Sequence, residues 1–194
     1  KEVKRDFDAC GIDNRFISNC SSGLEVPAGV GEPKSWPGYK EGEWSVQDRS
    51  SQLIAPFLGA LPGEKILDAC AAPGGKSTHI AELMNNEGKI WSVDRSSRRS
   101  KKIFANSERL GINCLQLLVA DSNELLAKHP EWQSFFDRIL IDAPCSGLGT
   151  LARHPDARWR MNQDNIQQLV AVQSQLLNSL APLLKNGGKL VYST

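Results

Sequence analysis

The most constraining feature of this sequence is the stretch from Ile66 to Thr78, ILDACAAPGGKST. An apolar run ends in Asp68 and gives way to small residues, a proline and a Gly74-Gly75 pair before a polar Lys-Ser-Thr. This order predicts a buried strand that breaks into a tight turn at the start of a helix. Such a turn directs free backbone N–H groups and the positive end of the helix dipole toward a bound ligand.

Strands and helices alternate along the chain after Gly63. We expect strands at 66–69, 89–93, 114–119, 137–141 and 189–192, and helices at 75–84, 97–110, 123–128 and 163–184. This alternation predicts an α/β fold with a mostly parallel sheet that is covered by helices on both faces. Gly187-Gly188 is expected to end the last helix. Its apolar residues fall mostly on one stripe, which suits packing on the sheet. They are Ile166, Leu169, Val170, Leu176, Leu177, Leu180 and Leu184.

The chain divides near residue 45. Prolines and glycines break the stretch from Ser21 to Glu43 into turns, so residues 1–44 are expected to be a lead-in segment or the remnant of an N-terminal domain. Residues 45–194 are expected to form the core. We expect it to open with a short helix at 45–58 whose apolar residues have helical spacing. These residues are Leu53, Ile54, Phe57 and Leu58.

Composition excludes several classes of protein. The 194 residues are 40% hydrophobic and 23% charged, which is typical of a globular domain. No apolar run approaches the roughly 20 residues that cross a bilayer, and the start lacks a signal peptide, so a cytoplasmic protein without membrane contact is expected. Five cysteines without CxxC or Cys/His spacing argue against a disulfide framework and against a metal site. A net charge of +1 means that any nucleic acid must be met by a local basic patch.

Each of four successive predicted strands has an aspartate at its carboxyl end. They are Asp68, Asp94, Asp121 and Asp142. A single aspartate in such a place is more often a helix cap or a turn former. Four at one edge of a sheet favour a polar ligand, because ligands of parallel sheets bind beyond the carboxyl ends of the strands.

The turn does not fit the common phosphate-binding patterns. A P-loop needs a glycine where this chain has Cys70, and Pro73 stiffens the loop, so a nucleoside triphosphatase is disfavoured. The dinucleotide pattern G-x-G-x-x-G is also absent, although Asp94 lies about 20 residues beyond the turn, where an acid can bind ribose hydroxyls. Ribose without a pyrophosphate site indicates an adenosine ligand such as S-adenosylmethionine.

Four segments, DACAAPGGKST, SVDRS, VAD and DAPCSGLG, resemble the successive motifs of the RNA cytosine-5 methyltransferases of the Nol/Nop/Sun (Sun/Fmu) family. The resemblance runs from about residue 38 to residue 194 and is strongest to the bacterial branch that modifies 16S ribosomal RNA. It implies a Rossmann-like class I core dependent on S-adenosylmethionine, and methyl transfer to carbon 5 of a cytosine in RNA through a covalent cysteine-cytosine adduct. Such a core has further strands after the fifth, so the sheet is expected to be truncated at its C-terminal end.

The resemblance also implies roles for individual residues. Asp94 would hold the ribose hydroxyls and Asp121 the adenine amino group. Asp142 would lie near the transferred methyl group and bind the N3 and N4 edge of the cytosine, in a pocket that Lys76 also lines. The turn after the first predicted strand would wrap the methionine part of the cofactor. It consists of Cys70, Ala71, Ala72, Pro73, Gly74, Gly75 and Lys76.

Cytosine chemistry requires a thiol. Carbon 5 attacks a methyl sulfonium only after a thiolate has added to carbon 6, and a base must later remove the carbon 5 proton. Cys145 is the evident candidate, but the resemblance gives it the release step and places the attacking cysteine after a threonine at the end of the next strand. The chain stops at Thr194, so that cysteine would be the next residue and the chain alone would be inactive. The alternative is that Cys145 itself attacks.

Basic residues follow the DAPCSG loop beside Trp159, where they would contact phosphates near the target base. They are Arg153, His154 and Arg158. Two other functions stay open: a methyltransferase of the same fold that acts on DNA or protein, and a non-catalytic RNA-binding protein. A mere binder has no need of Lys76, Asp142 and Cys145 together. The sequence does not indicate an oligomeric state.

Overall fold

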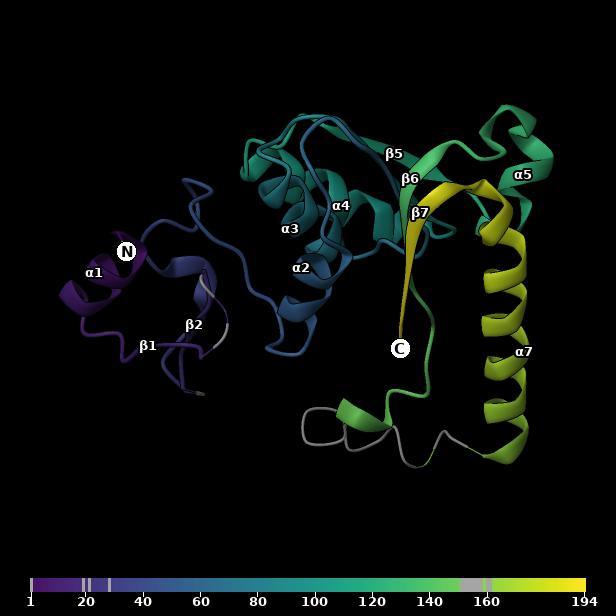
Figure 1. Ribbon diagram of the computed structural model, residues 1–194. Helices are drawn as coiled ribbons and strands as arrows, with labels where there is room; N and C mark the ends of the chain where they lie inside the picture. The colour runs from purple at the N-terminus through teal and green to yellow at the C-terminus, as the bar shows by residue number, and fades with distance from the viewer. Residues whose placement is uncertain (1, 19, 21, 28, 151–158, 160–161) are drawn as a thin grey trace.

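The computed structural model describes residues 2–18, 20, 22–27, 29–150, 159 and 162–194 (Figure 1). Its centre is a five-stranded sheet in the order β5-β4-β3-β6-β7, in which every neighbouring pair is parallel. The strands are β3 (Lys65–Asp68), β4 (Lys89–Asp94), β5 (Leu115–Val119), β6 (Phe136–Asp142) and β7 (Leu184–Ser193). The predicted α/β fold with a parallel sheet is therefore confirmed.

Helices cover both faces of the sheet, as expected for parallel strands that are buried on both sides. They are α2 (Ile54–Leu58), α3 (Gly75–Leu83), α4 (Ser97–Arg109), α5 (Leu125–Lys128) and α7 (Gln163–Leu180). Single 3₁₀ turns join them at η2 (Ser51–Leu53), η3 (Ser122–Glu124), η4 (Pro130–Trp132), η5 (Leu148–Thr150) and η6 (Ala181–Leu183). None of the helices that the structure describes is long and apolar enough to span a membrane.

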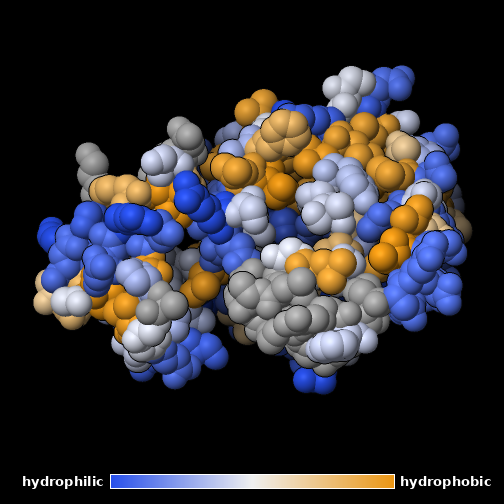
Figure 2. Space-filling model, turned by 90° about the horizontal axis from the view of Figure 1, so that it is seen from below, coloured by the Kyte–Doolittle hydropathy of each residue, from blue (hydrophilic) through white to orange (hydrophobic). Residues whose placement is uncertain are grey.

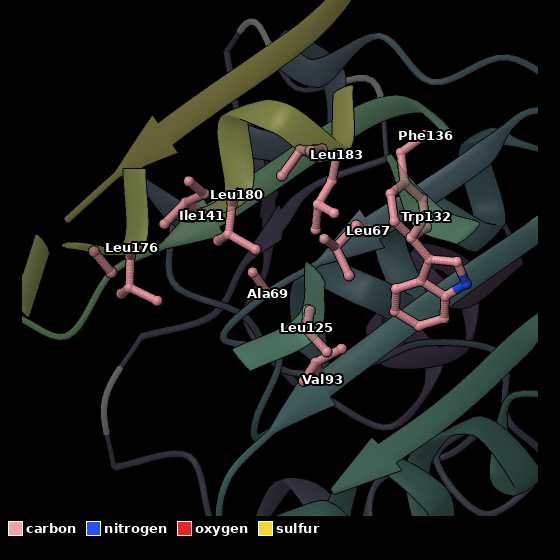
Figure 3. Packing of buried hydrophobic residues seen from close by; sticks show 12 residues of the cluster. Leu67, Ala69, Val93, Leu125, Trp132, Phe136, Ile141, Leu176, Leu180 and Leu183 are labelled. Carbon is pink, nitrogen blue, oxygen red and sulfur yellow. The ribbon is translucent and has the colours of Figure 1, made fainter. Parts of the chain in front are cut away.

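Two hydrophobic clusters lie on opposite faces of the sheet, because successive side chains of a strand point to opposite sides. Leu67 and Ile139 join the cluster beneath α5 and α7, which Figure 3 shows, whereas Ile66 and Leu140 join the cluster beneath α2 and α3. All four side chains are completely buried. This packing holds the carboxyl ends of β3 and β6 rigidly beside one another.

The N-terminal segment is a small unit of its own. It contains α1 (Glu2–Ala9), an antiparallel pair β1 (Arg15–Phe16) and β2 (Leu24–Glu25), and η1 (Pro33–Ser35). Phe7 packs edge-on against Trp36 and Trp44, with ring centroids 5.6 and 5.4 Å apart. Figure 1 shows this unit to one side of the sheet, joined to it by the chain that leads to α2.

The predicted helix at 45–58 is wrong in its first half. The α-helical part begins only at Ile54, after the 3₁₀ turn η2. Pro56 lacks an N–H and is tolerated only in the first turn of a helix, so an α-helix through this position has to start just before it. Of the four apolar residues expected to pack on the core, Leu58 is buried, but Leu53 and Phe57 are exposed.

The end of the long helix also differs from the prediction. Helix α7 ends at Leu180 rather than at residue 184, because the ring of Pro182 cannot continue an α-helix. Gly187-Gly188 therefore does not end the helix but lies within β7, at an irregularity where the pairing with β6 shifts register. The predicted apolar stripe is buried only at its C-terminal end, at Leu176 and Leu180; Ile166 and Val170 are exposed.

Candidate active site

The glycine turn between β3 and α3 is built as the sequence predicted. The Ala71 N–H donates to the carbonyl of Val93 over 2.9 Å, and the Ser122 hydroxyl donates to the carbonyl of Ala69 over 2.5 Å. These contacts tie the turn to the end of β4 and to η3. Gly74 precedes the helix with φ +103°, and a Cβ there would lie 3.1 Å from the Cα of Ile103, so only glycine fits without strain. The peptide bond between Ala72 and Pro73 is cis.

Asp94 links the end of β4 to this turn. Its Oδ2 accepts from the Ala72 N–H over 3.3 Å, and its Oδ1 accepts from the Ser96 N–H over 2.8 Å and from Arg99 Nη2 over 2.9 Å. The Asp94 side chain is only 3% exposed. The carboxylate is thus fixed beside the turn that is expected to hold the cofactor.

Asp121 serves as the N-cap of η3. Its Oδ1 accepts from the backbone N–H of Asn123 over 2.9 Å and from Asn123 Nδ2 over 3.0 Å. This is the capping role that a single strand-end aspartate most often has. The cap keeps the carboxylate at the same edge of the sheet as Asp94.

Asp142, at the end of β6, is held from two sides. Lys76 Nζ lies 2.6 Å from its Oδ2, and the Ser193 hydroxyl donates to its Oδ1 over 2.7 Å. The side chains of Lys76 and Asp142 are 18% and 32% exposed, so the pair is shielded but still open to solvent. The structure thus brings together two residues predicted to be catalytic from positions 66 residues apart in the sequence.

Ser193 was not identified from the sequence. It contacts Asp142 because β6 and β7 pair in a register that places these two residues opposite each other. The sequence pattern places Ser193 at a strand end but does not say which strands are neighbours. Prediction of this contact requires the order of the strands in the sheet, which the sequence pattern does not give.

Asp68 ends β3 with its side chain completely buried. Its Oδ2 accepts from the Ser77 hydroxyl over 2.6 Å, which ties the strand to the first turn of α3. Its Oδ1 is buried and has no hydrogen-bond partner among the described residues. Burial, with a smaller contribution from the negative charge of Asp142, raises the pKa of Asp68 to about 7 against the hydrogen bond from Ser77. The sequence assigned Asp68 to the edge of the site but gave it no role.

The two cysteines of the predicted site have different environments. The Cys145 side chain is exposed on the loop after β6. Cys70 is partly buried against the core beneath α7, and burial, together with the nearby Asp68 and Asp142, raises the pKa of its thiol to about 12. Because the thiolate is the reactive form of cysteine, Cys70 is unsuited to act as a nucleophile.

The predicted RNA-binding residues Arg153, His154 and Arg158 lie outside the described residues. Trp159, which follows them, has a side chain that is 83% exposed.

A wide groove of about 1020 Å³ lies between the N-terminal segment and α3. Trp36, Gln47, His79 and Glu82 are among the residues that line it, whereas the turn at 70–76 is not. Figure 2 shows the N-terminal segment as a separate lobe rich in hydrophilic residues, on the left of the view. The groove is therefore adjacent to the predicted site and distinct from it.

Comparison with known proteins identifies the family of this chain. The sequence signature of the family described as 16S rRNA methyltransferase RsmB/F matches residues 55–194. The probable ribosomal RNA small subunit methyltransferase B of Synechocystis sp. is 42% identical over 193 residues, which are 100% of this chain and 43% of that protein. The protein of the same name from Bacillus subtilis is 44% identical over 156 residues, or 80% of this chain and 34% of that protein.

Solved structures show the same fold. PH0851 superposes with a TM-score of 0.89 at 34% identity, over 98% of this chain and 42% of that one. NSun6 from Pyrococcus horikoshii with SFG superposes with a TM-score of 0.75 at 31% identity, over 87% of this chain and 41% of that one. The sheet is thus the Rossmann-like sheet of S-adenosylmethionine-dependent methyltransferases. The chain spans less than half the length of these curated relatives, and it belongs to the RsmB/F family of 16S rRNA methyltransferases.

Proposed function

We propose that this protein transfers a methyl group from S-adenosylmethionine to carbon 5 of a cytosine in RNA, with 16S ribosomal RNA as the substrate and the cytoplasm as the location. The observation that carries this proposal is the placement of Asp142 between Lys76 and Ser193, directly before the Cys145 loop. The names of the curated relatives support ribosomal RNA as the substrate. Residues 1–44 are, in this proposal, part of an N-terminal domain that precedes the catalytic core at 45–194.

The residues at the sheet edge fit S-adenosylmethionine chemically. Ribose hydroxyls and the adenine amino group are hydrogen-bond donors, and Asp94 and Asp121 supply the carboxylate oxygens that accept from such groups. The turn from Cys70 to Lys76 would hold the methionine part, next to the start of α3. A relative solved with SFG, an analogue of this cofactor, supports the assignment. When bound, the cofactor supplies an electrophilic methyl group on a sulfonium.

The chain's own residues would act on the cytosine. Asp142, held by Lys76, would donate a carboxyl proton to N3 and accept a hydrogen bond from the N4 amino group, and the donation to N3 would make carbon 6 a better acceptor for a thiolate. The attacking cysteine is expected directly after Thr194. Thr194 follows the end of β7, where Ser193 contacts Asp142. After methyl transfer, Cys145 would act as the base that takes the carbon 5 proton. The electron pair of that C–H bond would then form the C5–C6 double bond while the C6–S bond breaks and the attacking cysteine leaves as a thiolate.

Arg153, His154 and Arg158 are proposed to contact the RNA backbone beside the target cytosine. Replacement of all three by alanine in the full-length protein should weaken RNA binding and reduce its dependence on salt. Each lost phosphate contact lowers the number of counterions that binding releases from the RNA. Unchanged affinity and an unchanged salt slope would refute these contacts.

The test of the function compares two aspartates on the same strand. Full-length protein, S-adenosylmethionine and unmodified 16S ribosomal RNA are incubated, and 5-methylcytidine is measured by mass spectrometry. Asp142→Asn should lower methyl transfer by at least about 100-fold, which is the lower range for the loss of one catalytic group. Asp137→Asn is the matched control, since Asp137 pairs with Lys185 at the opposite end of β6.

The control variant should methylate RNA at close to the rate of the unmodified protein. Methyl transfer to DNA or protein in place of RNA would refute the proposed substrate. Equal activity of Asp142→Asn and Asp137→Asn would refute the proposed site.

A further inference from the structure

A side chain of α7 contacts the loop that carries Cys145. Gln173 Nε2 donates to the backbone carbonyl of Pro144 over 2.9 Å. In Figure 1 this helix runs alongside the chain that leaves β6. Gln173 is partly buried, whereas Pro144 and Cys145 are exposed. The contact therefore anchors the exposed Pro144-Cys145 segment of this loop to the helix.

This hydrogen bond controls the direction in which Cys145 leaves the strand. The Ala143 N–H donates to the carbonyl of Ser193 over 2.8 Å, which anchors the residue before the proline. The ring of Pro144 fixes its own φ. The carbonyl of Pro144 and the Cα of Cys145 belong to one planar peptide unit, so whatever holds this carbonyl also holds the Cα of Cys145. Rotation about ψ of Pro144 would move this unit, and the hydrogen bond from Gln173 restricts that rotation.

The helix gives Gln173 a rigid base. Leu176 and Leu180, which follow Gln173 by three and seven residues, are buried in the cluster beneath the helix. Residues at these spacings share one face of a helix. The side chain of Gln173 therefore extends from a helix face that is anchored on the sheet, at the point where that face passes the loop.

We propose that Gln173 is a positioning residue for Cys145 in the release step. This inference rests on the proposed function, in which Cys145 takes the carbon 5 proton and the C6–S bond then breaks. Gln173 touches neither the cytosine nor the cofactor. It acts by keeping Cys145 directed at carbon 5, so its loss should slow release of the methylated RNA and leave methyl transfer itself intact.

The test separates these two steps in the full-length protein. Gln173→Glu keeps the shape but replaces the donor by a carboxylate, and Gln173→Lys keeps a donor. The exposed Gln175→Leu on the same helix is the control for helix stability, and Cys145→Ala is the reference for failed release. Each variant is assayed for single-turnover methyl transfer, multiple-turnover rate and the amount of covalent protein–RNA adduct on denaturing gels.

We expect Gln173→Glu to reduce multiple turnover about tenfold, the effect of losing one hydrogen bond, and to accumulate adduct as Cys145→Ala does. Its single-turnover rate should stay within about twofold of the unmodified protein, since no group that contacts the reacting atoms has changed. Gln173→Lys should recover much of the turnover, and Gln175→Leu should behave as the unmodified protein.

The possible failures are distinguishable. If Cys145→Ala accumulates adduct but Gln173→Glu does not, the positioning role is refuted and the proposed function stands. If Gln173→Glu lowers the single-turnover rate and the turnover rate equally, its role is only structural and the inference is also refuted. If Cys145→Ala turns over normally without adduct, both the release role of Cys145 and the inference fail.

Discussion

Asp68 and Asp142 lie at neighbouring strand ends, but their environments differ. The Asp142 carboxyl group lies 2.6 Å from Lys76 Nζ, and its side chain is partly exposed. Asp68 is completely buried, so the charged form is disfavoured and its pKa rises to about 7. Of these two carboxyl groups, Asp142 is the one in contact with Lys76.

The stability of the protein should depend on the protonation of Asp68. Its pKa in the folded protein, about 7, lies above its ordinary value of 3.8, so the folded state binds the proton more tightly. The contribution of Asp68 to the free energy of unfolding is therefore fully present below about pH 4 and is lost as the pH rises through 7. Asp68→Asn keeps a side-chain oxygen for Ser77 and removes the titration. Relative to this variant, the unmodified protein should lose about 2 to 4 kcal/mol of unfolding free energy between pH 4 and 8.

Urea unfolding of both proteins at several pH values measures this difference. A free-energy gap that is the same at pH 5 and pH 8 would show that Asp68 does not titrate in this range.

At the scale of elements, β7 is the strand that completes the site. It supplies Ser193 to Asp142, and it accommodates an irregularity near Gly187 and Gly188 where its pairing with β6 shifts. Gly187 has φ +79°, and a Cβ on it would meet nothing within 4 Å. A Cβ on Gly188 would lie 2.8 Å from the carbonyl oxygen of Asp137, which is backbone of β6 and cannot move aside. The two glycines are thus required for different reasons.

Replacement by alanine should therefore lower the free energy of unfolding by different amounts at these two positions. Gly187→Ala adds only the strain of a left-handed backbone, about 1 kcal/mol. Gly188→Ala forces β6 and β7 apart, so its cost in unfolding free energy should be larger, about 2 to 4 kcal/mol. Chemical denaturation of the two variants measures both values. Equal losses would mean that the strands can separate at this point without cost.

The same elements show what sequence alone can predict. The β3 strand, its turn and the start of α3 were predicted to within about one residue, because the apolar run and the glycines act locally. The predicted helix at 163–184 is four residues longer than α7, because the prediction ends it at Gly187-Gly188 whereas Pro182 stops it earlier. Ser193 and Gln173 were missed because each is defined by what it contacts. Those contacts depend on strand order and helix docking, which periodicity does not encode.

At the scale of the whole molecule, one arginine joins the N-terminal segment to the catalytic core. Arg109, at the end of α4, donates through Nη1 to the carbonyls of Tyr39 and Trp44 over 2.6 and 3.0 Å. Its guanidinium also lies 4.0 Å from the centre of the Tyr39 ring. Hydrogen bonds from a charged donor and a cation–π contact combine at a single side chain. The contact holds the segment that forms one wall of the groove beside α3.

Removal of this side chain should loosen the N-terminal segment while leaving the sheet intact. In Arg109→Leu, trypsin should cleave after the exposed Lys40 at least about tenfold faster, because hydrogen bonds to a charged group contribute about 1.5 to 3 kcal/mol to the closed state. Arg98→Leu on the exposed face of α4 removes the same charge without this contact and should leave the cleavage rate unchanged. Binding of S-adenosylmethionine, measured by calorimetry on full-length protein, should be the same in both variants, because the turn at 70–76 does not line the groove. If Arg109→Leu weakened cofactor binding as well, the N-terminal segment would have to be part of the cofactor site rather than a neighbour of it.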